Sequence, residues 1–283
     1  MLTHKGKLYG DLTVACLADD HFILFGSGAM QEAHRRWFEQ NLTRNVTYRN
    51  RSDDWHGIAL SGPKSRSLLQ NLMRDDISSD AMKFRDVRQT FVGGVPVIVN
   101  RISFSGELGY EIYCHPAFLL CLAGAIEEIG KKFGYVWYGA RALMSMRLEK
   151  GWGAWGLEYR PDFNAIEAGL NVFIDWKKKF IGKEASLQAK DNKPEQKLVN
   201  MTINVDGIDV SNDEAILSDG TAVGYVSSGG YGHRAKKSMA MGYVKTDFAI
   251  PGTHLQVEIL GKFYTAEILG APIYDANGAN MRG

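Results

Sequence analysis

The chain has little cysteine and no long apolar run. Its 283 residues include three cysteines, Cys16, Cys114 and Cys121. Their odd number and their scatter through apolar segments indicate reduced core residues, with neither a disulfide framework nor a metal site. No stretch approaches the roughly 20 apolar residues that a membrane-spanning helix needs, and the N-terminus contains no apolar signal-peptide core. We therefore expect a cytoplasmic protein without membrane contact.

An excess of charge of either sign is also absent. The chain has 33 Lys and Arg against 32 Asp and Glu, which gives a formal net charge of +1. That balance provides no general attraction for nucleic acid or for a membrane surface, and we expect neither as a partner. The densest basic run, Lys177–Lys179, precedes Phe180 and is typical of a solvated loop.

Two nucleotide-binding motifs are missing as well. The chain contains no G-x-x-x-x-G-K-[ST] and no G-x-G-x-x-G after an N-terminal strand. A Rossmann half that binds FAD is therefore absent, and the chain alone is not expected to oxidise amines.

What is present predicts an α+β first domain. Short β-branched and apolar runs predict strands, and longer amphipathic segments predict helices. A polar, proline-containing segment at 188–197 is the expected linker to a second domain. We expect strands at 13–17, 21–25, 57–60, 87–92 and 95–103, and helices at 30–41, 117–130 and 139–150.

The region after the linker has a different texture. Short apolar runs recur between Gly or Asp turns at 198–205, 222–227, 238–244, 254–260 and 262–269, a pattern typical of a small antiparallel barrel or sandwich. Tyr231 and His233 are expected on a flexible glycine-rich turn. The predicted architecture is an α+β domain at about 1–190 followed by a small antiparallel β-barrel at about 195–283.

The segment RISFSGELGYE, Arg101–Glu111, is the most informative part of the chain. Ser105-Gly106 interrupts a strand and Gly109 begins another, which predicts a hairpin. Glu111 then lies in an extended segment between apolar residues. Its carboxylate belongs either on a solvated face or against paired donors, because an unpaired buried charge is costly. Both an arginine side chain and the amino-pyrimidinone edge of a pterin offer such donors.

Segments along the whole chain resemble, in the same order, those of the folate-dependent aminomethyltransferase family. This family includes the T-protein of the glycine cleavage system and the C-terminal folate-binding parts of dimethylglycine and sarcosine dehydrogenases. The matching segments are GDLTVACL, LSGPKSRSLL, RISFSGELGYEIY, SMRLEKGWGAWGLE, IEAGL, FIGKEASL, VGYVSSGGYG, MAMGYV and PIYDANGANMRG.

The resemblance implies a site for tetrahydrofolate. Asp11 matches the family aspartate beside the folate nitrogen that accepts the one-carbon unit, which implies an electrostatic and acid–base catalytic role. Taken by itself, Asp11 also fits a turn residue that starts a strand. Glu111 matches the glutamate that clamps the pterin through charge-assisted hydrogen bonds.

Four further residues are candidates for the folate pocket. Phe104 stands where some family members carry a tyrosine, so the ring is kept and the hydroxyl is lost. Tyr110 adjoins Glu111, but strand alternation points it to the opposite face. Trp155 and Glu158 lie in the loop that lines the folate channel in the family. Core packing is the competing explanation for Phe104 and Trp155.

The N-terminus departs from the family pattern, because the strand and helix that precede the GDLTV motif in the family have no counterpart here. We expect a truncated or split relative, close to the dehydrogenase branch, that joins a homo-oligomer or a flavoprotein partner. The expected function is tetrahydrofolate-dependent transfer of a one-carbon unit from a small-molecule amine donor, forming methylenetetrahydrofolate. The alternatives are a non-catalytic folate- or partner-binding module and a subunit of a flavin-dependent dimethylglycine or sarcosine dehydrogenase.

Overall fold

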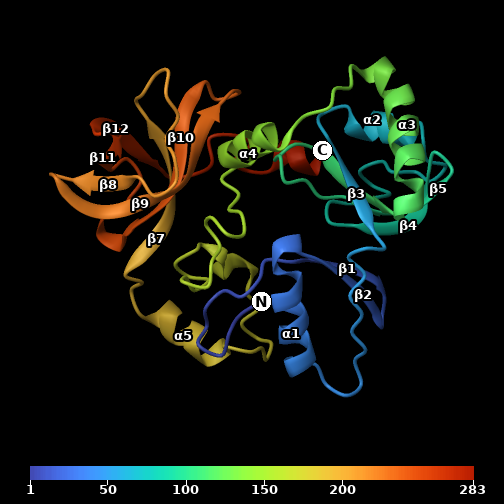
Figure 1. The fold of residues 1–283 in the computed structure, drawn as a ribbon, viewed down its shortest axis with the longest axis horizontal. Helices are drawn as coiled ribbons and strands as arrows, with labels where there is room; N and C mark the ends of the chain where they lie inside the picture. Colours follow the sequence, from blue (N-terminus) through green and yellow to red (C-terminus); the bar gives the residue numbers. More distant parts are fainter. The chain divides into compact units, whose positions relative to one another are not determined.

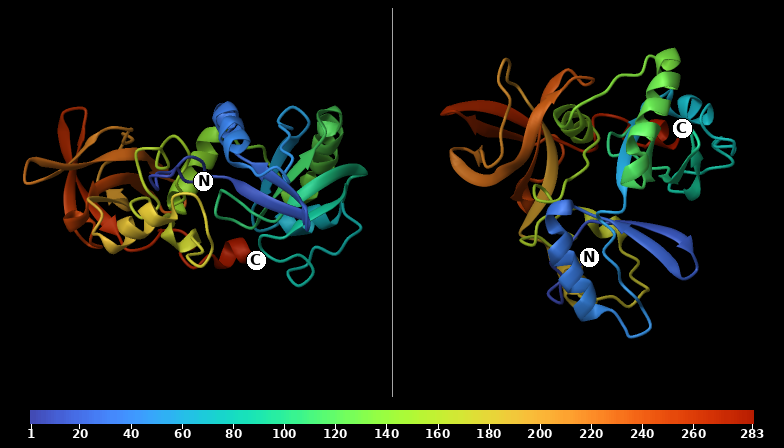
Figure 2. Two further views of the ribbon diagram at one scale, coloured as in Figure 1. Left: turned by 90° about the horizontal axis from the view of Figure 1, so that it is seen from below. Right: turned by 45° about the vertical axis from the view of Figure 1, so that its right-hand side comes forward.

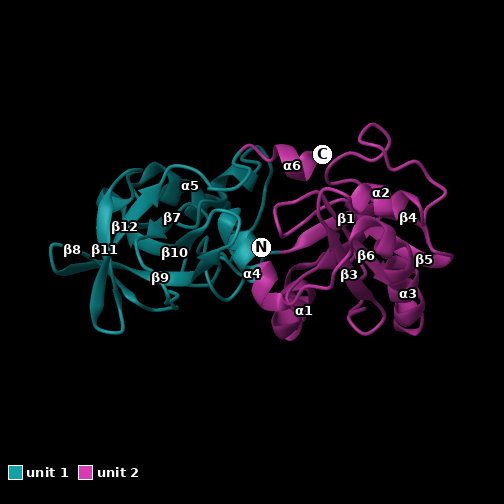
Figure 3. Ribbon diagram, turned by 90° about the horizontal axis from the view of Figure 1, so that it is seen from above, with its two compact units in different colours: residues 1–11, 144–276 teal, residues 12–143, 277–283 magenta.

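The computed structural model describes all 283 residues, which form two compact units (Figure 3). Unit 1 comprises Met1–Asp11 and Met144–Ala276, and unit 2 comprises Leu12–Leu143 and Asn277–Gly283. The boundary expected at 190–195 therefore falls inside unit 1, because the barrel packs with the first residues of the chain and with the segment before it. No helix is both long enough and apolar enough to span a membrane.

Unit 2 is built around a four-stranded antiparallel sheet with the order β3-β6-β5-β4. Figure 1 labels β3, β4 and β5 of this sheet. Helices α2 and α3 pack against it and cover a core that includes Leu69, Ile112 and Ile126. The strands are β3 His56–Ser61, β4 Val87–Val92, β5 Val95–Asn100 and β6 Gly109–Cys114, and the helices are α2 Ser65–Gln70 and α3 Leu119–Gly130, with short 3-10 turns η2 Pro116–Phe118 and η3 Lys131–Phe133 on either side of α3.

The second face of this sheet is the one that matters for the site. In β6 the side chains of Tyr110 and Ile112 are buried in the core, whereas Glu111 and Tyr113 alternate to the other face. A hairpin of β1 Thr13–Ala18 and β2 His21–Phe25 contributes Phe25, whose ring stacks on Tyr113 with centroids 4.1 Å apart. Figure 2 shows this hairpin in blue.

Other segments of unit 2 complete its packing. The 3-10 turn η1 Gly28–Met30 leads into α1 Gln31–Asn41, as the sequence predicts for 30–41. The last helix, α6 Ala279–Arg282, is held by Arg101, whose buried guanidinium donates to the carbonyl oxygens of Met82 and Arg282.

Unit 1 contains a closed six-stranded antiparallel barrel with the order β10-β7-β12-β11-β8-β9, which confirms the predicted architecture. Aliphatic side chains such as Val226, Val257 and Ile268 fill its interior. The strands are β7 Gln196–Ile203, β8 Ala215–Ser218, β9 Thr221–Gly232, β10 Lys237–Lys245, β11 His254–Ile259 and β12 Lys262–Leu269. The sequence analysis missed β8, which has only four residues, and expected a turn where β9 continues through Tyr231.

The start of the chain is anchored in unit 1 by an aromatic cluster. The rings of Phe163 and Tyr243 stack with centroids 3.7 Å apart, and Leu8 packs beside them. The Leu8 backbone N–H donates to the Phe163 carbonyl over 2.8 Å. The remaining elements of the chain are α4 Ala140–Glu149, η4 Leu170–Phe173, α5 Lys183–Asp191 and η5 Thr246–Phe248.

Candidate functional site

Glu111 lies half-buried on the second face of the unit 2 sheet. Its Oε2 accepts a 2.7 Å hydrogen bond from the Tyr113 hydroxyl two residues along β6, while Oε1 accepts none. Desolvation raises the pKa of the Glu111 carboxyl, and the Tyr113 hydrogen bond partly opposes this. The same burial raises the pKa of the Tyr113 hydroxyl, so it remains protonated as a donor. The arrangement leaves one carboxylate oxygen open to a donor from a ligand.

Asn100 is the direct cross-strand neighbour of Glu111. The register pairs Asn100 on β5 with Glu111 on β6, so both side chains lie on the same face. Asn100 is 3% exposed, and neither its Nδ2 nor its Oδ1 has a hydrogen-bond partner. Buried amides are usually paired, so this orphaned group is an unusual feature beside a carboxylate.

The residues that lie beside this pair on the two outer strands of the sheet provide no polar partner. The four residues side by side at this level of the sheet are called the row. Across the four strands the row consists of Ala59, Glu111, Asn100 and Val87. Only the two central members are polar. The row therefore presents a carboxylate and a carboxamide flanked by apolar side chains, with the Tyr113 ring in the next position along β6.

Two other candidates belong to the same strand or to the loop before it. Tyr110 is 1% exposed, packs in the core on the face opposite to Glu111, and receives a 3.2 Å hydrogen bond from Arg66 Nε at its hydroxyl. A wall position beside Glu111 is therefore excluded for Tyr110. Phe104 lies half-buried in the loop 101–108 that joins β5 to β6.

Asp11 is the last residue of the N-terminal segment of unit 1. Desolvation by its neighbours raises the pKa of the Asp11 carboxyl, and the Met1 ammonium partly offsets this. The side chain nevertheless keeps contact with solvent, which screens its charge. Such a carboxylate is accessible to a cationic or protonated amine.

Glu158 has a structural position instead of the expected pocket position. Its side chain is completely buried, and Oε2 accepts from Arg147 Nη1 and from the Ala154 backbone N–H, each over 2.9 Å. Oε1 accepts from the hydroxyl groups of Ser227 and Ser228. Four donors leave the carboxylate no free acceptor for a ligand, so the expectation from the sequence is corrected here.

Trp155 lies three residues before Glu158 and is partly buried against the aromatic cluster of unit 1. Its backbone forms an isolated parallel bridge with Tyr159. This placement is compatible with core packing and with a position in the wall of the expected folate pocket.

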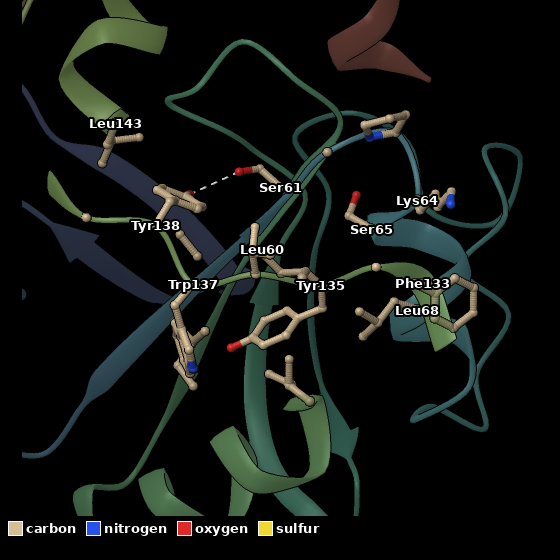
Figure 4. Close-up of a pocket in the computed structure, with 18 of the residues that line it drawn as sticks. Leu60, Ser61, Lys64, Ser65, Leu68, Phe133, Tyr135, Trp137, Tyr138 and Leu143 are labelled. Carbon is tan, nitrogen blue, oxygen red and sulfur yellow. Dashed lines mark hydrogen bonds between the residues drawn. The ribbon is translucent and has the colours of Figure 1, made fainter. Parts of the chain in front are cut away.

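A cavity of about 500 Å³ lies in unit 2, along β3 and the segment 133–143, and Ala59, the cross-strand neighbour of Glu111, is part of its lining (Figure 4). Tyr135, Trp137 and Tyr138 line it, and the hydroxyl groups of Tyr138 and Ser61 lie 3.1 Å apart in a hydrogen bond. Lys64 is the only charged residue in its lining, and none of the six candidates from the sequence takes part. The cavity suits an apolar group but supplies no carboxylate or imidazole for acid–base chemistry.

Asn100 and Tyr113 were not identified from the sequence. Strand alternation places Tyr113 on the same face as Glu111, so this signal was available. The pairing of Asn100 with Glu111 depends on the register across the loop 101–108, which alternation alone does not determine.

Comparisons with known proteins give consistent results over the whole chain. The profile of the GCVT N-terminal domain matches residues 1–178, and that of the glycine cleavage T-protein C-terminal barrel domain matches residues 196–275. Human mitochondrial dimethylglycine dehydrogenase is 37% identical over 279 residues, which cover 96% of this chain and 32% of the human protein. The chain thus spans about a third of the length of the dehydrogenases that it matches.

Shorter relatives are covered more completely. The aminomethyltransferase of Geobacillus sp. is 31% identical over 277 residues, which cover 97% of this chain and 75% of that protein. Among solved structures, the glycine cleavage system aminomethyltransferase T from Bartonella henselae aligns with a TM-score of 0.85 at 22% identity, over 98% of this chain and 75% of that one. At that identity the structural match shows a common fold.

Proposed function

The chain belongs to the family of the glycine cleavage T-protein, with its GCVT N-terminal domain and C-terminal barrel, and on this premise we propose that it transfers a one-carbon unit from an aminomethyl donor to tetrahydrofolate. The product of this reaction is methylenetetrahydrofolate. The family is one of aminomethyl transferases, whereas the cofactor, the donor and the product are the proposed part.

The observation that carries the proposal is the polar pair Glu111 and Asn100 in an apolar row. A half-buried carboxylate with a free oxygen fits a ligand that brings N–H donors, because hydrogen bonds from the ligand offset the free energy lost when the carboxylate is desolvated. The orphaned amide of Asn100 fits the same planar, polar ring edge. The residues present are thus compatible with a pterin.

Each candidate then has a defined task. Glu111 binds and orients the ring through accepted hydrogen bonds, with Tyr113 holding its carboxylate in place. Phe104 and Trp155 are proposed to exclude water from the ligand. Asp11 is proposed to stabilise positive charge on the amine of the donor and to accept or return its proton. Bound tetrahydrofolate supplies the nitrogen that accepts the one-carbon unit.

A second candidate function is supported by the similarity to dimethylglycine dehydrogenase. That protein is 37% identical, and the chain covers only about a third of it. The chain in this case is the folate-binding subunit of a flavin-dependent enzyme that oxidises an N-methyl amino acid. It accepts the one-carbon unit from that oxidation and does not act on a free donor.

The experiment begins with calorimetric titration of the purified chain with tetrahydrofolate. Bound protein is then assayed for methylenetetrahydrofolate with an aminomethyl donor alone, and with dimethylglycine and a dimethylglycine-oxidising flavoenzyme. Product in the first assay supports the transferase, and product only in the second supports the subunit. Binding without product in either assay identifies a non-catalytic module. Absence of binding rejects the proposal.

A further inference from the structure

Asn100 carries a feature that packing does not explain. Both polar atoms of its carboxamide are buried and have no hydrogen-bond partner. Leaving a buried polar group unpaired is destabilising, because the hydrogen bonds lost with water are not replaced. An apolar side chain of similar size would avoid this cost, and the two preceding positions of β5, Ile98 and Val99, are already apolar and buried. Asn100 is thus a destabilising residue in a strand whose neighbouring residues suit a buried position.

The position of this residue relates it to Glu111. Directly opposed residues on neighbouring antiparallel strands have Cβ atoms about 4.5–5.5 Å apart. Asn100 and Glu111 are such a pair. A planar ring that donates to the free Oε1 of Glu111 therefore extends within reach of the Asn100 carboxamide, because both side chains project from the same face.

The two groups differ in what they recognise. An ionised carboxylate only accepts hydrogen bonds, whereas a carboxamide offers two donor hydrogens and an acceptor oxygen. Glu111 alone selects N–H groups and is indifferent to an adjacent carbonyl. Asn100 adds a donor for that carbonyl, so the pair matches an edge on which N–H donors stand beside a C=O acceptor.

We propose that Asn100 is a ligand-binding, specificity-determining residue. Its carboxamide donates a hydrogen bond to a ring carbonyl that lies beside the N–H groups bound by Glu111. This inference rests on the proposed function, and it names the ligand class as a heterocycle with an amide-type edge, such as an amino-pyrimidinone. The unpaired amide is then a cost in the free protein that the ligand relieves. Functional sites commonly keep such locally unfavourable residues.

Asn100→Val separates this role from a structural one, because valine suits a strand interior and removes both unpaired atoms. We expect the melting temperature of the ligand-free variant to stay the same or rise, while its affinity for tetrahydrofolate falls by about tenfold or more. The matched control is Asn200→Val on β7 of unit 1, where one amide oxygen is likewise unpaired, and its affinity should remain that of the parent.

Each outcome decides the matter. Parent-like affinity in Asn100→Val overturns the inference and leaves the proposed function intact. A lower melting temperature in the ligand-free variant gives Asn100 a structural role and also overturns the inference. A parent protein that binds no tetrahydrofolate rejects both the inference and the proposed function. Unchanged or raised stability with weakened binding supports the assignment.

Discussion

Arg147 and Glu158 form an ion pair 2.9 Å apart in the interior of unit 1, with side chains that are 2% and 0% exposed. Two serines and a backbone N–H complete the hydrogen bonding of the carboxylate. The pair links α4, the loop before Tyr159 and β9 of the barrel. It therefore stabilises the part of unit 1 in which Trp155 lies.

Glu158→Gln should be strongly destabilising. The substitution leaves the Arg147 guanidinium buried without a counter-charge, and breaking a buried pair in this way costs about 3–5 kcal/mol. Thermal and urea unfolding measure the loss. Glu39→Gln, which removes an exposed partner of Arg35 on α1, is the control and should leave the melting temperature almost unchanged. Equal melting temperatures for Glu158→Gln and the parent would contradict the structural role.

Much of the fold follows from local patterns in the sequence. The hairpin of β4 and β5 is predicted to the residue at its turn, because Gly93-Gly94 separates two apolar runs. Strand β9 was expected to end before its glycines, since glycine is unfavourable in strands. The structure continues the strand because Gly229 and Gly230 pair with Ala240 and Met239 of β10. A Cβ at Gly229 would overlap Val210, so close packing requires glycine at this position.

The site is less predictable because its contacts are distant in the sequence. Glu158 was expected in a pocket, and its actual partners Ser227 and Ser228 lie about 70 residues further along the chain. Asn100 has no sequence signal of its own. The role proposed for it rests on the register that pairs it with Glu111 and on the lack of a hydrogen-bond partner for its amide.

Glu111→Gln tests whether this residue holds the ligand. The amide keeps the shape but loses the charge and one acceptor, so tetrahydrofolate affinity should fall by roughly 1.5–3 kcal/mol. Calorimetric titration measures the change. Glu128→Gln on α3 alters a carboxylate whose side chain is 74% exposed and should bind like the parent. Unchanged affinity in Glu111→Gln would remove this residue from the site.

The raised pKa of Glu111 predicts a pH dependence of binding. Ligand donors favour the ionised carboxylate, so affinity should weaken as the pH falls through a pKa that lies above the ordinary value of 4.5. Titrations from pH 7 downward should show this loss in the parent. They should not show it in Glu111→Gln, which has no carboxyl group to titrate at this position.

The stability of the free protein should have the opposite trend. The folded state holds the Glu111 proton more tightly than the unfolded chain does, so this residue's contribution to stability decreases as the pH rises from 4.5 through the raised pKa. Glu111→Gln should therefore gain stability relative to the parent between acidic and neutral pH. A constant difference in unfolding free energy over this range would contradict the upward shift.

Asp11→Asn tests the proposed catalytic role. Because Asp11 is exposed, the variant should fold normally and keep most of its tetrahydrofolate affinity. Loss of a general acid–base group should lower the rate of methylenetetrahydrofolate formation by on the order of a hundredfold. Asp19→Asn, at the turn between β1 and β2, is the matched exposed control. Equal rates for Asp11→Asn and the parent would exclude the role.

From the exposed β1–β2 hairpin we predict that the protein associates with itself or forms a stable complex with another chain. It is a sheet of only two strands, and an isolated hairpin is at best marginally stable. Its side chains include the exposed apolar residues Val14, Phe22 and Leu24, which are 58%, 50% and 41% exposed. Unpaired strand edges and grouped apolar side chains both favour association with another chain.

Light scattering on the purified protein across micromolar concentrations measures this association, and we expect a mass above that of one chain. The double variant Phe22→Glu and Leu24→Lys places charges on the hairpin and should shift the protein toward monomer without unfolding it. Leu260→Glu, at an exposed turn between β11 and β12, is the control and should leave the mass unchanged. A parent protein that stays monomeric throughout would mean that the hairpin is stable without a partner chain.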